Sequence, residues 1–393
     1  MSAITTNGRD GAPSEGLIRR RMTRQVSVGG VTIGGGAPIR VQSMCSTDTR
    51  DVEATLAQIE PLVQAGCEII RLAVPDREAA KAFGKIKQRC PIPMVADIHF
   101  DYELALAAID EGADKVRINP GNIYQKAGRK GVEAVVRKAA AAGIPIRIGV
   151  NSGSIEARLL EKYGYPTPEA AVESALGYIR TFEDLGFTDI VVSVKFSEVP
   201  DMIRAYQLLS EAVDYPLHLG VTESGTTFSG SIKSAIGIGT LLWQGIGDTI
   251  RVSLTTNDKT EEVRAAYEIL KALGLRTHGP MLTSCPGCGR AEVDQVGLTL
   301  QIAKALEGVN KNVRVAVMGC VVNGPGEARE ADIAVFAGKG VGVIVRRGKI
   351  LRRVKEEEIV PAVLAEVERW DDAAVEQEAQ HQLPVLQSPL RNP

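Results

Sequence analysis

Residues 115–150 have the sequence KVRINPGNIYQKAGRKGVEAVVRKAAAAGIPIRIGV, in which a strand pattern, a helix pattern and a second strand pattern follow one another. The segments 115–119 and 145–150 are short, apolar and rich in β-branched residues, whereas 131–142 has apolar residues at helical spacing. A strand, a helix and a strand in this order are typical of a parallel sheet covered by helices. The fold of this region therefore depends on how often the unit is repeated.

The same alternation extends from residue 39 to residue 254. Eight apolar runs have strand character: 39–44, 68–74, 93–98, 115–119, 145–150, 189–195, 216–221 and 249–254. Segments with helical periodicity separate them, among them 52–65, 102–111, 131–142, 169–185, 202–212 and 231–244. Eight such units predict an α/β fold, a closed (β/α)8 TIM barrel with its chemistry at the carboxyl ends of the strands. An open doubly wound sheet is the alternative, but no G-x-G-x-x-G follows the first strand.

The chain changes character beyond residue 275. Helix patterns at 291–306 and 356–369 and strand patterns at 313–318, 332–337 and 342–345 predict a small α+β domain. Glycines at 29–30 and 34–36 indicate turns of a short hairpin ahead of the barrel. We therefore expect a mobile arm over 1–24, the barrel over 25–275, the α+β domain over 276–370 and a polar tail over 371–393.

Composition limits the class of protein. With 393 residues, 44% of them hydrophobic, the chain has material for more than one domain. A net charge of -2 argues against general nucleic-acid binding, and Arg19, Arg20 and Arg21 on the polar arm are expected to be solvated. The start lacks the apolar run of a signal peptide, and no run elsewhere reaches membrane-spanning length. We expect a soluble, cytoplasmic protein that binds no membrane.

Three cysteines beyond the barrel predict a metal site. Cys285 and Cys288 form a C-x-x-C motif, which lets two thiolates hold one metal or two corners of a cluster, and Cys320 follows later. Three thiolates leave one position open. The carboxylate of Glu327, carried on a Gly-Pro-Gly turn, is the candidate fourth ligand, and a hard oxygen on iron would be displaceable, which suits catalysis. A structural zinc knuckle or a buried C-x-x-C is the alternative.

Basic and polar residues share faces near the ends of the predicted strands, as the two-residue period of a strand shows. The basic members are Arg71, Arg117, Arg147, Lys195 and Arg251, and the polar members are Asn119, Asn151, Ser193 and Ser253. Cations gathered at one barrel mouth repel one another and lose hydration unless an anion, carboxylates or water compensate them. Arginine forks and a lysine suit phosphate oxygens, so we expect a small diphosphate as ligand. Each residue taken singly could instead be a salt-bridge partner.

Other strand ends carry candidate acids and bases. Asp97 precedes His99 by two residues and could orient it, although a lone histidine is more often structural than catalytic. Glu223 lies just beyond the seventh predicted strand. It is a candidate proton donor where local desolvation keeps its carboxyl group protonated.

Seven motifs resemble those of one enzyme family. They are VQSM at 41–44, ADIHFD at 96–101, RINPGN at 117–122, IRIGVN at 146–151, HLGVTE at 218–223, GIGD at 245–248 and GCVVNGPGE at 319–327. Together they are similar to the 4-hydroxy-3-methylbut-2-enyl diphosphate synthase family in its bacterial two-domain form. The resemblance extends from about residue 21 to residue 369, and the differences are confined to the arm and the tail.

The resemblance implies an oxidoreductase of the methylerythritol phosphate route to isoprenoids with a [4Fe-4S] cluster. Such an enzyme reductively opens the ring of 2-C-methyl-D-erythritol 2,4-cyclodiphosphate and eliminates water, with two electrons from flavodoxin or ferredoxin. The implied cluster ligands are Cys285, Cys288, Cys320 and Glu327. The implied diphosphate clamp is Arg71, Arg117, Arg147, Lys195 and Ser253, with Asn151 and His99 nearby and Glu223 beside the reacting carbons. The resemblance also implies a homodimer in which one subunit's cluster domain closes over the other's barrel.

Two other functions stay open from the residues alone. A non-enzymatic iron–sulfur sensor whose barrel binds a phosphorylated metabolite would show redox changes without a product. A barrel lyase held together by zinc would be colourless.

Overall fold

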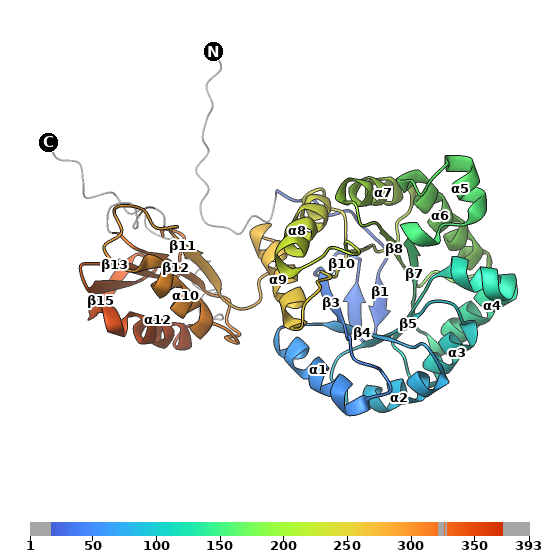
Figure 1. Cartoon of the computed structure of the whole chain (residues 1–393), viewed down its shortest axis with the longest axis horizontal. Helices are drawn as coiled ribbons and strands as arrows, with labels where there is room; N and C mark the ends of the chain where they lie inside the picture. The colour runs from blue at the N-terminus through green and yellow to red at the C-terminus, as the bar shows by residue number, and fades with distance from the viewer. Residues whose placement is uncertain (1–16, 321–325, 327, 372–393) are drawn as a thin grey trace, which may run out of the picture. The chain divides into compact units, whose positions relative to one another are not determined.

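The computed structural model describes residues 17–320, 326 and 328–371. Contacts within the chain divide it into two compact units, and the division falls between Arg276 and Thr277. The first unit is a barrel of strands surrounded by helices, and the second is a sheet with helices against it (Figure 1). None of the helices in the described part of the chain is long and apolar enough to cross a membrane.

Eight strands build the barrel. They are β3 (Arg40–Met44), β4 (Ile69–Ala73), β5 (Met94–Ile98), β6 (Lys115–Ile118), β7 (Ile146–Asn151), β8 (Ile190–Lys195), β9 (His218–Leu219) and β10 (Thr249–Ile250). They pair in the order β8-β7-β6-β5-β4-β3-β10-β9, and a parallel bridge between Val192 and Leu217 closes the ring. The predicted barrel is thus confirmed, although β9 and β10 are shorter than the runs that predicted them.

Helices follow the strands around the outside of the barrel (Figure 1). They are α1 (Val52–Gln64), α2 (Arg77–Lys87), α3 (Tyr102–Asp110), α4 (Pro120–Ala142), α5 (Ala157–Tyr163), α6 (Pro168–Asp184), α7 (Val199–Ala212), α8 (Thr227–Trp243) and α9 (Thr260–Ala272). The strand residues that face them are aliphatic and buried, among them Ile70, Leu72, Ile98, Ile118 and Ile148. Alternate residues of the same strands must therefore face the barrel interior.

Helix α4 begins earlier than its periodicity predicts. The side chain of Asn119 accepts hydrogen bonds from the backbone N–H groups of Gly121 and Asn122, and Pro120 occupies the first turn, so the helix is capped at its true start. Gly128 has non-helical dihedral angles, φ 64° and ψ -167°, and interrupts the apolar pattern. Helix α5 was not predicted.

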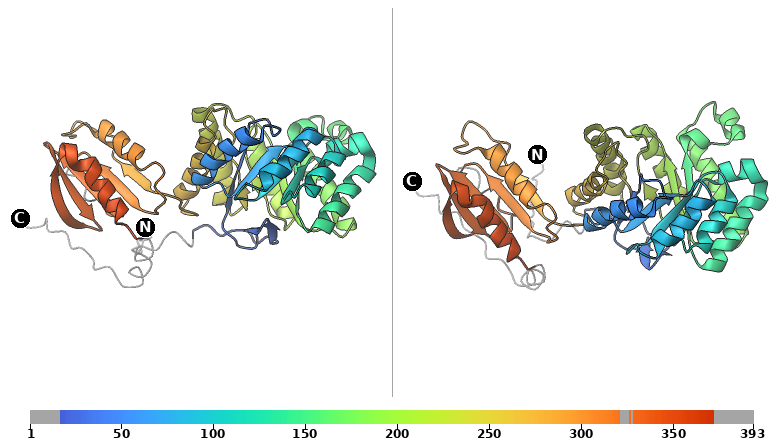
Figure 2. Two further views of the ribbon diagram at one scale, coloured as in Figure 1. Left: turned by 90° about the horizontal axis from the view of Figure 1, so that it is seen from below. Right: turned by 60° about the horizontal axis from the view of Figure 1, so that its bottom comes forward.

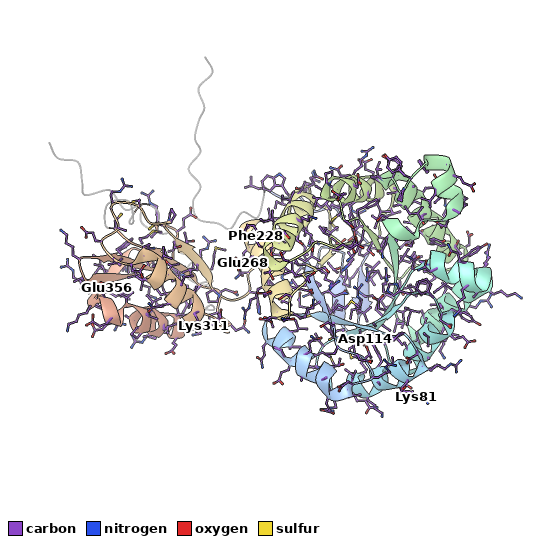
Figure 3. The ribbon with its side chains drawn as sticks, viewed as in Figure 1. Lys81, Asp114, Phe228, Glu268, Lys311 and Glu356 are labelled. Atoms are coloured by element: carbon purple, nitrogen blue, oxygen red, sulfur yellow. The ribbon has the colours of Figure 1, made fainter. Side chains whose placement is uncertain are left out.

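A hairpin covers the amino end of the barrel. Strands β1 (Val26–Val28) and β2 (Val31–Ile33) pair antiparallel, and they pack Val28 and Ile33 against Ile69 and Val95 inside the barrel. Figure 2 shows the hairpin lying across one end of the barrel. Asp114, labelled in Figure 3, accepts hydrogen bonds from Lys87 Nζ at 2.6 Å and from Met94 N at 2.7 Å beside the hairpin turn. With this end covered, the carboxyl end is the one through which a ligand can enter.

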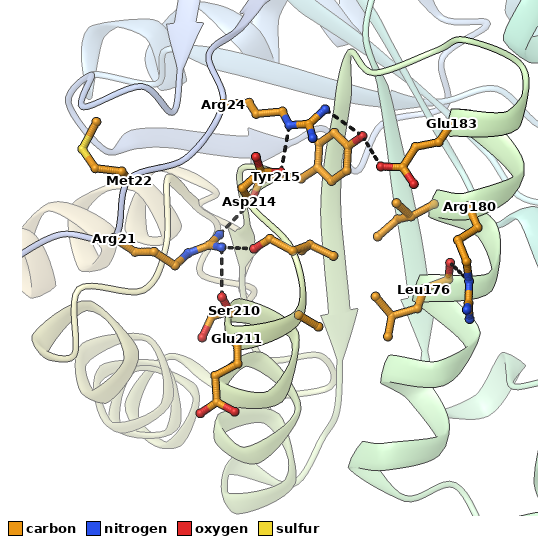
Figure 4. Close-up of a pocket in the computed structure, with 13 residues that line it drawn as sticks. Arg21, Met22, Arg24, Leu176, Arg180, Glu183, Ser210, Glu211, Asp214 and Tyr215 are labelled. Atoms are coloured by element: carbon orange, nitrogen blue, oxygen red, sulfur yellow. Dashed lines mark hydrogen bonds and ion pairs between the residues drawn. The ribbon is translucent and has the colours of Figure 1, made fainter.

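The described part of the arm is bound to the barrel. Arg21 donates hydrogen bonds to the backbone oxygens of Ser210, at 3.1 Å, and of Tyr215, at 2.7 Å (Figure 4). The guanidinium group of Arg24 lies over the ring of Tyr215, 4.4 Å from its centroid. Arg20 donates a hydrogen bond to a backbone oxygen at 2.5 Å. The expectation that these arginines are solvated is therefore wrong for Arg20 and Arg21, which cap carbonyl groups at the amino end of the barrel.

The second unit is a mixed five-stranded sheet in the order β11-β12-β13-β14-β15. Its strands are β11 (Met281–Ser284), β12 (Arg314–Met318), β13 (Ile333–Gly338), β14 (Val341–Arg346) and β15 (Lys349–Lys355), and its helices are α10 (Gln295–Ala305) and α12 (Ile359–Glu368). Strands β11, β12 and β13 are parallel, and β14 and β15 continue antiparallel. Both helices share one core with the sheet, so an α+β unit is present as predicted, but β11 and β15 were not predicted.

Candidate active site

Besides Lys115, which lies nearer the amino end of β6, five basic side chains enter the barrel interior from five strands or strand ends. Arg117 pairs in register with Asp97 on one side and Arg147 on the other, so the three side chains lie on one face at one height. Lys195 ends β8 beside Asn151, which ends β7. Buried positions along these faces are occupied by Arg71, Arg117, Arg147 and Lys195, with exposed fractions of 6%, 4%, 0% and 7%. Arg251, directly after β10, is the fifth.

Asp97 is the carboxylate at the centre of this group. Its Oδ1 accepts a hydrogen bond from Arg117 Nη1 at 3.0 Å, and its Oδ2 lies 3.6 Å from Arg71 Nε. Burial by itself raises the pKa of Asp97, but Arg71 and Arg117 outweigh burial and hold the pKa well below its usual value. Asp97 therefore stays ionised and fixes the directions of two arginine forks.

His99 lies at the rim. Its Nε2 is 3.1 Å from Arg117 Nη1 and 3.5 Å from Asp97 Oδ2, and 46% of its side chain is exposed. The prediction that Asp97 and His99 lie close together is confirmed. The exposed ring can meet a ligand at the mouth, whereas Asp97, with 3% exposure, cannot easily do so.

Arg147 and Lys195 complete the group. Arg147 Nη1 donates a hydrogen bond to Ser193 Oγ at 2.7 Å, while its Nε and Nη2 have no hydrogen-bond partner among the described residues. Burial, together with Arg71 and Arg147, lowers the pKa of Lys195 well below its usual value. Burial also lowers the pKa of Arg71, to about 10. Shifts in this direction occur where buried cations outnumber the carboxylates that neutralise them. Such a group of cations is suited to an anionic ligand.

Two glycines leave room for the basic side chains. A Cβ atom at Gly149 would lie 2.3 Å from Arg117 Nε, and one at Gly220 would lie 3.0 Å from Lys195 Nζ. Both separations are too short for ordinary contact. The motifs IRIGVN and HLGVTE thus need these glycines because larger residues would displace the cations opposite them.

Glu262 on α9 holds the eighth strand end in place. Its carboxylate lies 3.4 Å from Arg251 Nη2, and it accepts hydrogen bonds from Ser43 Oγ at 3.2 Å and Leu254 N at 3.0 Å. Only 1% of Glu262 is exposed. The loop held in this way contains Ser253, whose backbone oxygen accepts a hydrogen bond from Ser224 Oγ.

Glu223 follows β9 and is exposed at the mouth. Its Oε2 accepts a hydrogen bond from Ser197 Oγ at 2.7 Å, and its φ angle is 53°, in the left-handed region that non-glycine residues seldom occupy. A backbone held in this conformation at a strand end is a common feature of functional sites. Ser197 fixes the carboxylate side chain that the backbone turn presents.

Asn151 and Asn119 both donate hydrogen bonds to Ser154 Oγ. Asn119 Nδ2 donates a hydrogen bond to Ser154 Oγ at 2.7 Å, and the N–H group of Asn151 donates one to the same oxygen at 3.3 Å. Asn151 is half-buried and stands beside Lys195 in register. Its side chain is therefore placed at the edge of the cation group.

The second unit places Cys285 and Cys320 at the ends of neighbouring strands. Cys285 follows β11, and Cys320 comes two residues after the neighbouring parallel strand β12. The Sγ atom of Cys285 accepts a hydrogen bond from Gly319 N at 3.4 Å, which places it beside the residue that precedes Cys320. Cys288 is exposed and the other two are half-buried. A backbone N–H group directed at a cysteine sulfur, and thiols that are not fully buried, are compatible with an iron–sulfur ligand set.

Among the described residues, no three histidine, cysteine or acidic side chains are close enough to hold a metal ion. The predicted fourth ligand, Glu327, lies outside the described residues. The three thiols are ligands of the type that a soft metal or an iron–sulfur cluster takes.

Gln295 connects the two cysteine-bearing segments. This buried residue at the start of α10 donates hydrogen bonds from its amide to the backbone oxygen of Val317 at 2.9 Å and to that of Cys285 at 3.5 Å. A Cβ atom at position 319 would lie 2.7 Å from Gln295 Oε1, so Gly319 is needed for this packing. The sequence pattern did not indicate Gln295, Glu262 or Ser197, because each acts through a contact with a distant segment.

Two family models match the chain. The GcpE TIM-barrel domain covers residues 23–267, and the GcpE protein C-terminal domain covers residues 281–369. The 4-hydroxy-3-methylbut-2-en-1-yl diphosphate synthase (flavodoxin) of Geobacter sulfurreducens is 56% identical over 347 residues, which are 88% of this chain and 97% of the relative. The enzyme of the same name from Symbiobacterium thermophilum is 58% identical over 353 residues, 90% of this chain and 94% of the relative. The chain therefore belongs to the GcpE family of 4-hydroxy-3-methylbut-2-en-1-yl diphosphate synthases.

Proposed function

We propose that this enzyme converts 2-C-methyl-D-erythritol 2,4-cyclodiphosphate into 4-hydroxy-3-methylbut-2-enyl diphosphate by reductive ring opening and loss of water. The observation that supports this substrate best is the group of five basic side chains in the barrel, of which Asp97 and Glu262 compensate only a part. A cyclic diphosphate carries the missing negative charge. The names of the two relatives describe the same product.

The barrel residues bind and orient the substrate. Arg117 and Arg71, both held by Asp97, supply guanidinium forks, and Arg147 completes the clamp on the phosphate oxygens. Lys195 adds a point charge. The polar side chains of Asn151, His99 and Ser253 contact the sugar or phosphate oxygens at the rim. Binding of the diphosphate places the carbons of the ring near Glu223.

Glu223 transfers the proton that the loss of water requires. Its side chain is oriented by Ser197 Oγ at 2.7 Å and is exposed at the mouth, where its carboxylic acid form would give a proton to the oxygen that leaves as water.

The second unit would hold a [4Fe-4S] cluster through Cys285, Cys288, Cys320 and Glu327. The donor set of three thiolates and one carboxylate suits iron–sulfur better than zinc, for which four sulfur or nitrogen ligands are usual. When bound, the cluster supplies the two electrons of the reduction one at a time. Gln295 keeps the segments of Cys285 and Cys320 at a fixed separation.

Flavodoxin is the electron donor that the relatives' names support, and ferredoxin is the alternative from the sequence. A homodimer in which one subunit's cluster closes over the other's barrel follows from the family resemblance and is part of this proposal. The cytoplasmic location also stays a prediction. No sensor function is proposed, because the two relatives are named as synthases.

The proposal is tested by measuring turnover and spectra of anaerobically purified protein. With the cyclodiphosphate and reduced flavodoxin it should form the linear diphosphate, and its absorption and paramagnetic resonance should be those of an iron–sulfur protein. A colourless protein with bound zinc, or a substrate that is not consumed by iron-loaded protein, would contradict it. Glu327→Ala should lower turnover and alter the resonance, while Glu330→Ala, in an exposed carboxylate nearby, should change neither.

A further inference from the structure

The barrel contains a second group of polar side chains below the clamp. Lys115 precedes Arg117 by two residues on β6 and so lies about 6–7 Å nearer the amino end on the same inward face. His218 on β9 and Gln42 on β3 also face inward, since their registers match those of inward residues on neighbouring strands. Lys115, His218 and Arg147 have no exposed surface, and Gln42 has 1%.

Several polar atoms of this group have no hydrogen-bond partner among the described residues. They are Lys115 Nζ, Arg147 Nε and Nη2, His218 Nε2, and both the amide nitrogen and the amide oxygen of Gln42. Each buried polar atom left without a partner costs about 1–3 kcal/mol. Such a cluster is stable only if its interior is occupied by something that bonds to these atoms.

The occupant must mainly accept hydrogen bonds. The Arg147 and Gln42 nitrogens are obligate donors, a charged Lys115 donates three times, and only the amide oxygen of Gln42 is an obligate acceptor. The buried carboxylates of the barrel are used elsewhere, since Asp97 binds Arg117 and Glu262 binds Arg251 and Lys259. A water molecule donates as often as it accepts, whereas an anion only accepts.

The charges of Lys115 and Arg147 are close enough to act on His218. Burial lowers the pKa of His218 well below its usual value, and Arg147, Lys195 and Lys115 lower it further. Burial and the same arginine also lower the pKa of Lys115. An enclosed negative charge would reverse the effect on the lysine and make its protonated form stable.

We propose that the barrel interior beneath the clamp binds a small monatomic anion of the halide class between Lys115, Arg147, His218 and Gln42. A monatomic anion accepts hydrogen bonds from every direction and needs little more room than a water molecule. The site differs from that of the diphosphate, because its lysine lies deeper on β6 and has no exposed surface. The anion holds Arg147 from below and leaves the mouth side of the same guanidinium group free for substrate.

Anomalous diffraction from bromide tests whether an anion occupies the site at Lys115. Crystals of the substrate-free holoenzyme grown with sodium bromide in place of chloride should show an anomalous peak within hydrogen-bond distance of Lys115 Nζ. Peaks confined to the mouth at Arg117 and Lys195, or non-anomalous water density around Lys115, would overturn the proposal.

Thermal unfolding gives a second readout in solution. At constant ionic strength, replacing gluconate by bromide should raise the unfolding midpoint of the wild type by about 2–4 °C. Lys115→Met should abolish this rise, and Lys81→Met, which changes an exposed lysine on α2 (Figure 3), should leave it intact. If Lys115→Met does not fold, the bromide peak and the midpoints of the wild type and Lys81→Met still show whether the anion binds. An unfolding midpoint of the wild type that is the same in both salts would count against the anion.

Discussion

Arg117 donates a hydrogen bond to Asp97 at 3.0 Å, with both side chains buried and in register on neighbouring strands. The same carboxylate lies 3.6 Å from Arg71. One acid thus orients two arginines, of which Arg71 also donates from Nε and Nη2 to Met44 Sδ. Because the acid is shared, the direction of each fork depends on the other.

Replacing Asp97 by Asn should destabilise the protein by about 3–5 kcal/mol, because two buried cations lose their partner. The folded pKa of Asp97 is lowered, so its contribution is complete above the unfolded pKa of about 4 and is lost only as pH falls through the folded value. Urea denaturation of wild type and Asp97→Asn should therefore show a constant difference between about pH 5 and pH 8. Asp214→Asn, which breaks the exposed pair with Arg24, should cost less than about 1 kcal/mol. A difference that disappears already near neutral pH would contradict the assignment.

Gly149→Ala should weaken substrate binding without unfolding the barrel. The added Cβ would lie 2.3 Å from Arg117 Nε, so the guanidinium group must turn away from the mouth. We expect the Kd for the cyclodiphosphate, measured by calorimetry, to rise about tenfold, which corresponds to about 1.4 kcal/mol. Gly153→Ala is the matched control, because nothing lies within 4 Å of its Cβ position, and it should bind as the wild type does. Equal affinities for the two variants would show that Arg117 does not contact the substrate.

The sequence predicts the strand-borne half of this site well. Arg71, Arg117 and Arg147 sit on short apolar runs, where the period of two determines which residues face inward, and the structure places them there. The same rule predicted that Asp97 and His99 would lie together. The parts fixed by local periodicity are thus open to prediction from one sequence.

The remaining residues of the candidate sites are positioned by contacts between segments that are distant in the sequence. Glu262 accepts a hydrogen bond from Ser43, 219 positions away, and nothing in the helix pattern of α9 distinguishes this carboxylate from a solvated one. Gln295 is similar, since its partners on β12 and after β11 become neighbours only in the folded sheet. Strand β10 is shorter than predicted, and Leu254 at the end of the predicted run donates its N–H group to Glu262 instead of to a neighbouring strand.

Substrate binding should take up a proton at Lys195. Burial and the neighbouring arginines lower the pKa of this lysine in the free enzyme, and a bound diphosphate raises it again. Between the lowered and the raised pKa, binding therefore draws a proton from the buffer. Calorimetry in two buffers with different heats of ionisation measures this uptake. Lys195→Met should take up less, by as much as one proton, and identical uptake in both proteins would show that Lys195 is already charged.

Glu223→Gln should slow catalysis while leaving substrate binding nearly unchanged. The amide keeps the hydrogen bond with Ser197 but cannot deliver a proton at the required step. We expect kcat to fall about 10²- to 10⁴-fold with the substrate Kd changed only slightly. Ser197→Ala, which loosens the carboxylate without removing it, should lower kcat less. An unchanged cluster resonance is the control, and an unaffected kcat in Glu223→Gln would remove this residue from the proton transfer.

Gln295→Leu should disturb the segments that carry Cys285 and Cys320 while leaving the barrel unchanged. The amide joins the backbone oxygens of Val317 and Cys285, so its loss leaves the two strand ends linked there by the weaker hydrogen bond from Cys285 N to Val317 O, at 3.3 Å. In metal-free protein, Cys285 and Cys320 should then react faster with a thiol reagent, and less iron should be retained after reconstitution. Thr299→Val removes another partner of the same amide but leaves both backbone contacts, so it should behave as the wild type. Because thiol reactivity is measured without metal, a normal rate in Gln295→Leu would refute the positioning role even if the variant had lost activity.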